Sequence, residues 1–168
     1  DQLRQYIPLL IGTRSSLEVE LRRAHLALDW LVRANLPAWL RLAKCDELAA
    51  KLEGLEVIDP NTTVQTLRMI TDIIQKYAEK QYLPQQAGTM LTEATWAAVR
   101  GMRAVAEAER AKSAARASNA ASWAAWTTWA VMATEEVAEE AESVVLPLQA
   151  EAHQLYHAMI ECGTHPNG

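Results

Sequence analysis

Apolar residues recur at intervals of three or four along most of this chain, which is the spacing of an amphipathic helix. No segment shows the sustained alternation that a half-buried strand would need. The two clearest stripes comprise Leu17, Leu21, Ala24, Leu28, Leu31 and Val32, and Val64, Leu67, Ile70, Ile74, Tyr77 and Ala78. The pattern therefore predicts an all-α protein, a bundle of about six or seven helices within a single domain, 1–168.

Glycine, proline and capping residues predict where the helices begin and end. The predicted boundaries are a short helix over 3–11 ended by Gly12, a helix from Ser15 or Ser16 to Arg33, a break at Asn35-Leu36-Pro37, a helix opened by Pro37, a helix capped by Asp46 and ended by Gly54, a helix started by Asp59-Pro60, and a break at Pro147. These boundaries divide the domain into N-terminal helices (1–83), an Ala/Trp-rich part (89–145) and a closing helix (147–162).

The Ala/Trp-rich part carries small residues at seven-residue intervals. Positions 97, 104, 111, 118, 125 and 132 are Ala, Ala, Ala, Ser, Ala and Met, and positions 101, 108, 115, 122 and 129 are Gly, Ala, Ala, Ser and Trp. The two series have the relative offset of the seam positions of packed helices, so we expect close helix packing. One unbroken helix would be about 70 Å long. A break near 116–122, giving a helical hairpin, is therefore favoured over one protruding helix.

Composition adds two constraints. The chain lacks phenylalanine but has six tryptophans, so its core should combine small side chains with very large ones. The net charge of −5 argues against a general nucleic-acid binder, which needs a basic face. Arginines are concentrated in the first quarter and glutamates follow Thr134, an asymmetry that could orient a partner or pair the two ends of the bundle.

The cysteines and the uncharged stretch bear on location. Cys45 and Cys162 are expected to be free thiols, with one disulfide as the alternative. No secretory signal is recognised, so the protein is expected to be cytoplasmic. The uncharged stretch 117–134 approaches the length of a membrane span, but its serines, threonines and asparagine make it weakly apolar. A buried helix is the expectation for this stretch.

Two groups of residues are candidates for contact with a partner. Trp123, Trp126 and Trp129 form a slanted stripe on a helix, which suits an aromatic anchor for a protein partner. The same spacing also suits tryptophans that fill a core of small residues. The acidic run includes Glu135, Glu136, Glu139 and Glu140, which could dock a basic partner or form a solvated helix face.

The histidines raise the question of a metal site. His153 and His157 lie four residues apart and project from one face of a helix, a spacing that can bind a transition metal. Surface histidines are the alternative, because no third ligand is evident. His25, among apolar residues, is expected to be partly buried beside a backbone or acidic partner. No Ser–His–Asp or Cys–His arrangement can be argued, and no cofactor is expected.

Three segments carry a resemblance. They are DWLVRANLPAWLRLAKCDELAAKLEGLEVI at 29–58, the Trp-Ala-Ala segment, and LPLQAEAHQLYHAMI at 146–160. In this order they resemble a group of uncharacterised bacterial proteins in which an LPAWLRLA-type helix precedes Ala/Trp-rich helices. A vaguer likeness is to alanine-rich helical immunity proteins. The resemblance implies a helical fold and supplies no catalytic residue.

These observations favour a non-catalytic helical protein that acts as an interaction module or scaffold. It would bind a protein partner, in one form neutralising it, or associate with itself. The alternative is a helical bundle that binds a small ligand or a metal through His153 and His157 or a tryptophan-lined pocket. An enzyme using Glu and His in a helical pocket is a weaker hypothesis, and its reaction cannot be named.

Overall fold

A computed structural model describes residues 16–78, 85–118 and 139–164, and within these ranges every regular element is a helix. The elements are α2 (Leu17–Trp30), the π-helical turn η1 (Leu31–Asn35), α3 (Leu36–Leu42), α4 (Asp46–Glu53), α5 (Val64–Ala78), α6 (Gln85–Ala111) and α8 (Glu139–Thr164). The predicted all-α bundle is confirmed. Trp123, Trp126, Trp129, Glu135 and Glu136 lie outside the described residues.

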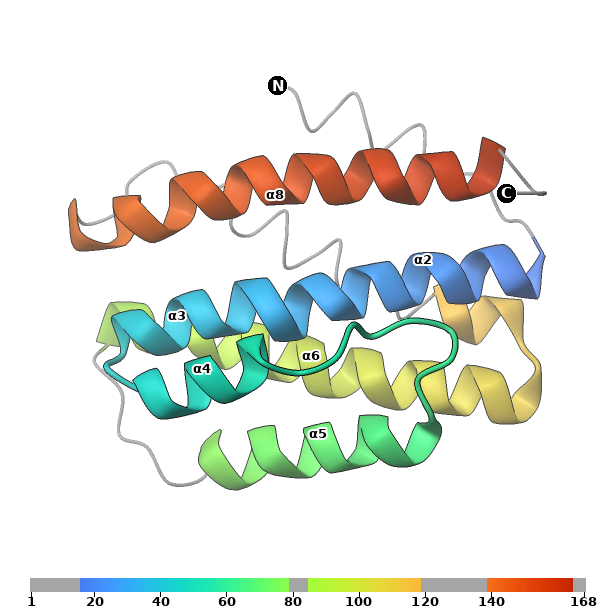
Figure 1. Cartoon of the computed structure of the whole chain (residues 1–168), viewed down its shortest axis with the longest axis horizontal. Coiled ribbons are helices and arrows are strands. Elements are labelled where there is room, and N and C mark those ends of the chain that lie inside the picture. The colour runs from blue at the N-terminus through green and yellow to red at the C-terminus, as the bar shows by residue number, and fades with distance from the viewer. Residues whose placement is uncertain (1–15, 79–84, 119–138, 165–168) are drawn as a thin grey trace.

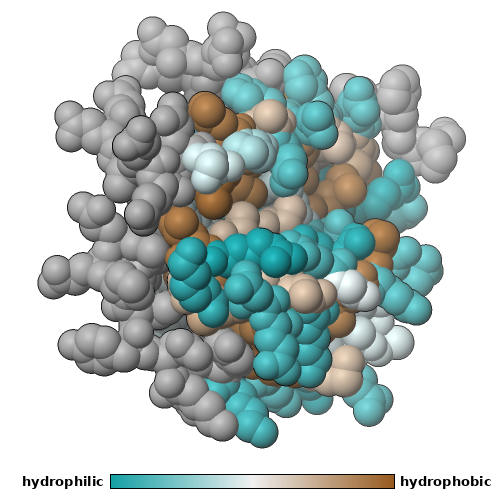
Figure 2. Space-filling model, turned by 60° about the vertical axis from the view of Figure 1, so that its left-hand side comes forward, coloured by the Kyte–Doolittle hydropathy of each residue, from teal (hydrophilic) through white to brown (hydrophobic). Residues whose placement is uncertain are grey.

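The helices form layers around α2 (Figure 1). In that view α8 lies above α2 and α3, α6 lies below them, and α5 is outermost on the far side of α6. α4 packs against α3, to which a short turn joins it. The core therefore follows the line of α2 and α3, which helices cover on both sides. On the face that Figure 2 shows, hydrophilic residues form the most continuous surface and hydrophobic residues appear between them.

The predicted break at Asn35-Leu36-Pro37 is wrong, because α2 continues through η1 directly into α3. In this wider turn the Leu36 N–H donates to the carbonyl of Leu31, five residues back. A proline inside a regular helix clashes with the carbonyl four residues before it, and a π-turn gives that carbonyl more room. The chain thus keeps helical direction through Pro37 and carries Trp39 into the core, where its side chain is 2% exposed.

The predicted break at Pro147 is also wrong, since Pro147 lies inside the continuous helix α8. Pro147 is exposed, so the hydrogen bond that proline cannot donate is missing on the solvent side. The buried residues of α8 keep one register on both sides of the proline: Val145, Leu148, Ala152, Leu155 and Met159. Burial of this single stripe favours one helix over two.

The helix predicted to start at Asp59-Pro60 begins four residues later, at Val64. Thr63 is its capping residue, because the Thr63 hydroxyl accepts the N–H of Thr66 at 3.1 Å. Asp59 instead organises the preceding turn: its carboxylate accepts the N–H of Asn61 at 2.8 Å. Leu67, Ile70 and Ile74 of α5 are buried as predicted.

The Ala/Trp-rich part breaks before the predicted range 116–122, of which 116–118 are helical and 119–122 lie outside the described residues. α6 ends at Ala111, Lys112 has a φ of 49°, and residues 114–118 are helical again. The Ser113 N–H donates to the carbonyl of Ala108 at 3.1 Å, which is the helix-ending motif that a left-handed residue creates. Of the predicted seam positions before this turn, Ala97, Gly101 and Ala108 are buried, Ala104 is partly buried and Ala111 is exposed.

Gly101 is the closest point of the seam. A Cβ placed on Gly101 would lie 2.7 Å from Cδ2 of Leu28, whose side chain is completely buried in α2. Glycine lets α6 approach α2 here without displacing the buried Leu28 side chain. The seven-residue pattern therefore marks a real contact between helices, as the sequence predicted.

Candidate interaction surface on α5 and α6

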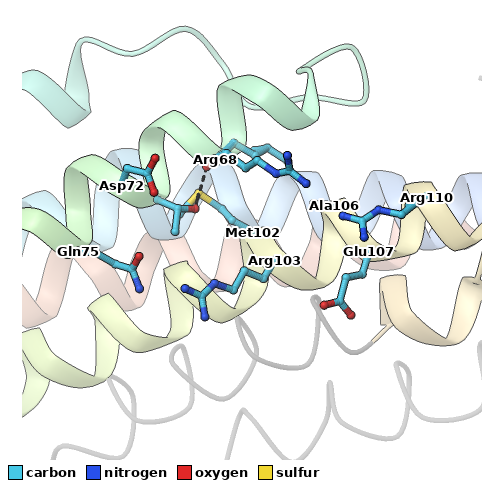
Figure 3. Close-up of a pocket in the computed structure, with 10 residues that line it drawn as sticks. Arg68, Asp72, Gln75, Met102, Arg103, Ala106, Glu107 and Arg110 are labelled. Carbon is cyan, nitrogen blue, oxygen red and sulfur yellow. Dashed lines mark hydrogen bonds between the residues drawn. The ribbon is translucent and has the colours of Figure 1, made fainter.

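A groove runs between α5 and α6 on the outer side of the bundle (Figure 3). The described residues that line it enclose a volume of about 190 Å³. They are Leu67, Arg68, Thr71, Asp72 and Gln75 from α5, and Met102, Arg103, Ala106, Glu107 and Arg110 from α6. On each helix, three polar residues have the spacing i, i+4 and i+7, so each helix presents a row of polar side chains along its own edge of the groove.

The arginines of this groove differ from the other arginines of the described ranges. Arg68, Arg103 and Arg110 have no carboxylate within ion-pair distance among the described residues. Glu107, which also lines the groove, pairs instead with Arg116 at 3.3 Å and points away from α5 (Figure 3). Three guanidinium groups thus face the groove with their hydrogen-bond donors available.

Within the described residues, the arginines of the basic first quarter are used within the fold. Arg22 pairs with Glu18, Arg23 with Glu20, Arg33 with Asp29 and Arg41 with Glu53. The hydrogen bond and the charge of Glu53 raise the pKa of the Arg41 guanidinium. Arg100 lies 5.5 Å from the centre of the Trp96 ring. This comparison leaves the α5–α6 groove as the place where described arginines without an ion-pair partner gather.

The groove was missed by the sequence prediction, although a signal for it exists. Arg68, Asp72 and Gln75 repeat the spacing of Arg103, Glu107 and Arg110 on the polar sides of two helices. That signal becomes meaningful only when α5 and α6 are known to be antiparallel neighbours (Figure 1).

The outer face of α5 has a second, shallower recess. Its described lining is Gln65, Arg68, Met69, Asp72, Ile73 and Lys76, around a volume of about 370 Å³. The Met69 side chain is 52% exposed there, and Ile73 is partly buried. Arg68 and Asp72 line both hollows, so the recess and the groove form one continuous surface, which we call the α5–α6 surface.

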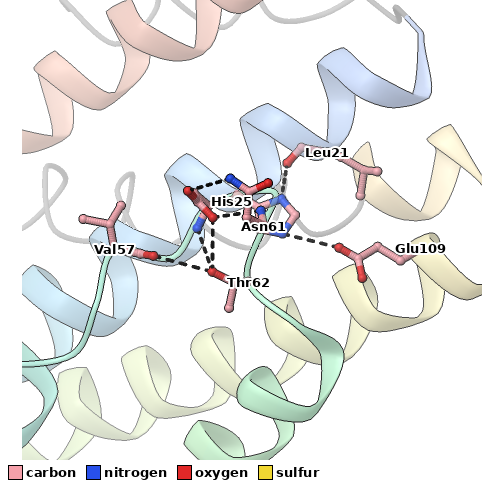
Figure 4. Close-up of polar contacts among 7 residues, drawn as sticks. Leu21, His25, Val57, Asn61, Thr62 and Glu109 are labelled. Carbon is pink, nitrogen blue, oxygen red and sulfur yellow. Dashed lines mark hydrogen bonds and ion pairs between the residues drawn. The ribbon is translucent and has the colours of Figure 1, made fainter.

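A second polar cluster surrounds His25 (Figure 4). The imidazole is 1% exposed, its Nδ1 lies 2.6 Å from the carbonyl of Leu21, and its Nε2 lies 3.5 Å from the Glu109 carboxylate. His25 is thus completely buried rather than partly buried, and it lies beside both a backbone carbonyl and a carboxylate, where the sequence predicted one or the other. The contact links α2 to α6 and lies next to Asn61 and Thr62 (Figure 4). These two residues belong to a turn in which the Asp59 N–H donates to the Thr62 hydroxyl at 3.0 Å.

Asp59 gives this turn a dependence on pH. The hydrogen bond from the Asn61 N–H, with smaller contributions from the Asn61 amide, the Thr62 N–H and the charge of His25, lowers the pKa of Asp59. A lowered pKa means that the ionised carboxylate stabilises the fold above its unfolded-state pKa, and that this contribution disappears as pH falls through the folded-state pKa. The turn should therefore weaken in acid.

Replacement Asp59→Ala is expected to lower stability at neutral pH and to matter progressively less as the pH falls toward 3. Urea unfolding of both proteins at a series of pH values measures the difference. Glu56→Ala is the matched control, since Glu56 is an exposed carboxylate of the same connection. A deficit in Asp59→Ala that stays constant down to pH 3 would contradict the role of the ionised Asp59.

The structure places the remaining predicted residues as follows. Glu139 and Glu140 lie in the first turn of α8. Cys45 and Cys162 are free thiols, as expected, and burial, the largest influence, raises the pKa of Cys162. His153 is partly buried and His157 exposed on α8. Within the described ranges no group of three His, Cys, Asp or Glu side chains could hold a metal ion.

The metal site on His153 and His157 stays a prediction that rests on two ligands.

Among the described helices, none combines the length and the apolar character that crossing a membrane requires. The chain matches no protein-family model, no curated protein and no solved structure.

Proposed function

We propose that this protein is a non-catalytic helical interaction module that docks another protein on the α5–α6 surface. One observation carries the proposal: Arg68, Arg103 and Arg110, which have no ion-pair partner among the described residues, all line a single groove that continues into the recess around Met69. Guanidinium groups are effective partners for carboxylates, because their planar donor geometry matches that of the acceptor.

The exposed methionine supports the same proposal. Among the large exposed hydrophobic residues, Met69 lies in a recess, whereas Trp96 lies beneath the guanidinium of Arg100. Methionine adapts its shape to many partners and is common at binding surfaces. An apolar contact bordered by charges is the usual composition of a protein interface, with an apolar centre and a polar rim.

The position of α5 also suits docking. α5 is the outermost helix of the layers and makes its main helix contacts with α6, which leaves its opposite face open to a partner (Figure 1). Docking on α5 requires no movement of the buried core. The occupant that we propose is a different protein with an acidic docking segment, because the arginines without an ion-pair partner among the described residues make the groove positive.

Site-specific photocrosslinking in the native cell tests the proposal. A photoreactive residue at position 69 should crosslink to a discrete protein, and the purified protein should bind this chain directly. Met69→Glu should weaken that binding at least tenfold, equivalent to about 1.4 kcal/mol. Val57→Glu is the control, since Val57 is 59% exposed in the connection before α5.

Two results would contradict the proposal. One is a crosslink only to a second copy of this chain, which would make the surface a self-association interface. The other is equal loss of binding in Met69→Glu and Val57→Glu, which would mean that added charge anywhere on the surface weakens the complex.

A further inference from the structure

The floor of the α5–α6 groove is apolar and closed to hydrogen bonding. Leu67, Thr71, Met102 and Ala106 form it, and all four are buried. The Thr71 hydroxyl donates to the carbonyl of Leu67 at 2.8 Å and also lies 3.6 Å from the Met102 sulfur. Because this hydroxyl is already engaged within the protein, the floor would accept an apolar side chain better than a polar one.

The edges of the groove are charged in a defined arrangement. Arg103 and Arg110 are seven residues apart on α6, which corresponds to two helical turns, or about 10 Å along the helix axis. Arg68 extends from α5 on the other side of the groove, toward the end where Arg110 lies (Figure 3). Positive groups therefore occupy both walls at one end and one wall at the other.

This arrangement matches one kind of partner. A partner helix that lies along α6 could place two carboxylates, seven residues apart in its sequence, opposite Arg103 and Arg110. An aliphatic residue three or four positions after the first carboxylate would then lie above the apolar floor. Asp72 also lines the groove and, among the described residues, has no cation within ion-pair distance. Its negative charge lies in the same groove as the arginines and would repel the closely spaced phosphates of a nucleic acid, whereas a helix can place an uncharged residue there.

We infer that the α5–α6 groove binds an acidic amphipathic helix of the partner protein, with glutamates two turns apart paired to Arg103 and Arg110 and a leucine between them on the floor formed by Leu67, Met102 and Ala106. The inference rests on the proposed function and specifies the partner's chemistry. Arg68 adds a second guanidinium near the partner's carboxylate that pairs with Arg110. The Glu107 carboxylate pairs with Arg116 and points away from α5, so it does not oppose this contact.

The test uses a synthetic helical peptide with glutamates at i and i+7, a leucine at i+4, and alanine and glutamine elsewhere. Titration into the isotopically labelled full chain is followed by NMR, including the side-chain Nε–H signals of Arg68, Arg103 and Arg110. These signals should shift with the peptide, and binding should weaken as salt is added. A peptide with glutamine in place of both glutamates is the ligand control.

Charge-matched variants complete the experiment. The triple variant Arg68→Gln, Arg103→Gln, Arg110→Gln should bind the acidic peptide at least tenfold more weakly. The triple variant Arg22→Gln, Arg41→Gln, Lys51→Gln removes the same net charge elsewhere on the surface and should bind within about twofold of the unchanged protein. Melting temperatures of both variants check that each remains folded.

Three outcomes would overturn the inference: no shift of the three arginine signals, equal weakening in both triple variants, or tighter binding of a single-stranded oligonucleotide than of the acidic peptide. These failures are distinguishable from a failure of the proposed function. A partner whose binding depends on Met69 but not on Arg103 and Arg110 would retain docking on α5 while excluding the acidic helix in the groove.

Discussion

Replacing Arg23 by methionine should reduce the free energy of unfolding by about 3–5 kcal/mol, because it breaks a buried ion pair by removing one partner. Arg23 and Glu20 have side chains that are 5% and 4% exposed, and their atoms lie 3.0 Å apart. The Arg23 Nε also donates to the carbonyl of Met159 in α8 at 2.8 Å. The variant leaves the buried Glu20 carboxylate without this guanidinium and removes a link between α2 and α8.

Thermal unfolding measures the effect, with an expected fall in Tm of roughly 6–20 °C for a domain of this size. Arg22→Met is the matched control, since Arg22 is the adjacent residue and its partner Glu18 is 77% exposed. The control should cost about 0–1 kcal/mol. Adding Glu20→Gln to Arg23→Met should recover part of the loss. Equal effects of Arg22→Met and Arg23→Met would contradict the importance of burial.

Leu28→Ala should cost about 2–5 kcal/mol, the range for a leucine truncated in a packed core. Leu28 is completely buried against Gly101, where an added Cβ would lie 2.7 Å from the leucine.

The effect of Gly101→Ala on the free energy of unfolding should therefore change sign when Leu28 is truncated. In the unchanged protein this substitution should be destabilising, because overpacking costs about 1–3 kcal/mol and outweighs a gain in helix propensity of about 1 kcal/mol.

In the Leu28→Ala background, Gly101→Ala should instead stabilise by about 1 kcal/mol, since the added methyl group enters vacated space and the propensity gain remains. Urea unfolding of the two single variants and the double variant gives the coupling energy directly. An identical effect of Gly101→Ala in both backgrounds would show that α2 and α6 do not meet at this point.

The sequence predicted those parts of the fold that local patterns determine. The apolar stripe of α5, the cap predicted at Ser15 or Ser16 and found at Ser16, and the small-residue contact at Gly101 all correspond to structure, because each depends on residues within one or two helical turns. The Ser16 hydroxyl accepts the N–H of Val19, as a capping residue should. Periodicity was reliable in these cases because the same residues both form the helix and bury it.

The errors at Pro37 and Pro147 have a different origin. Proline removes one hydrogen bond wherever it occurs, but the result depends on what the rest of the helix gains from staying intact. At Pro37 a π-turn absorbs the proline, and at Pro147 the missing bond faces solvent while the buried stripe continues. Neither compensation can be recognised without knowing which residues the neighbouring helices cover.

The candidate site was the least predictable part for a similar reason. The sequence drew attention to the basic first quarter, yet Arg22, Arg23, Arg33 and Arg41 are paired within the fold. The guanidinium groups that lack an ion pair in the described part of the chain belong to two helices whose antiparallel packing brings them together. Counting charges along the chain cannot distinguish an arginine that has a partner from one that does not.

The outermost position of α5 has a thermodynamic consequence. Helices with few packing partners open locally at lower free energy than the core of the same domain. α5 depends mainly on α6, and the groove spans both helices. A partner in that groove would bind only while α5 is packed against α6. Binding would therefore make the local separation of α5 from α6 less frequent. Occupancy of the surface should thus appear as slower amide exchange in α5, even where no residue of α5 touches the partner.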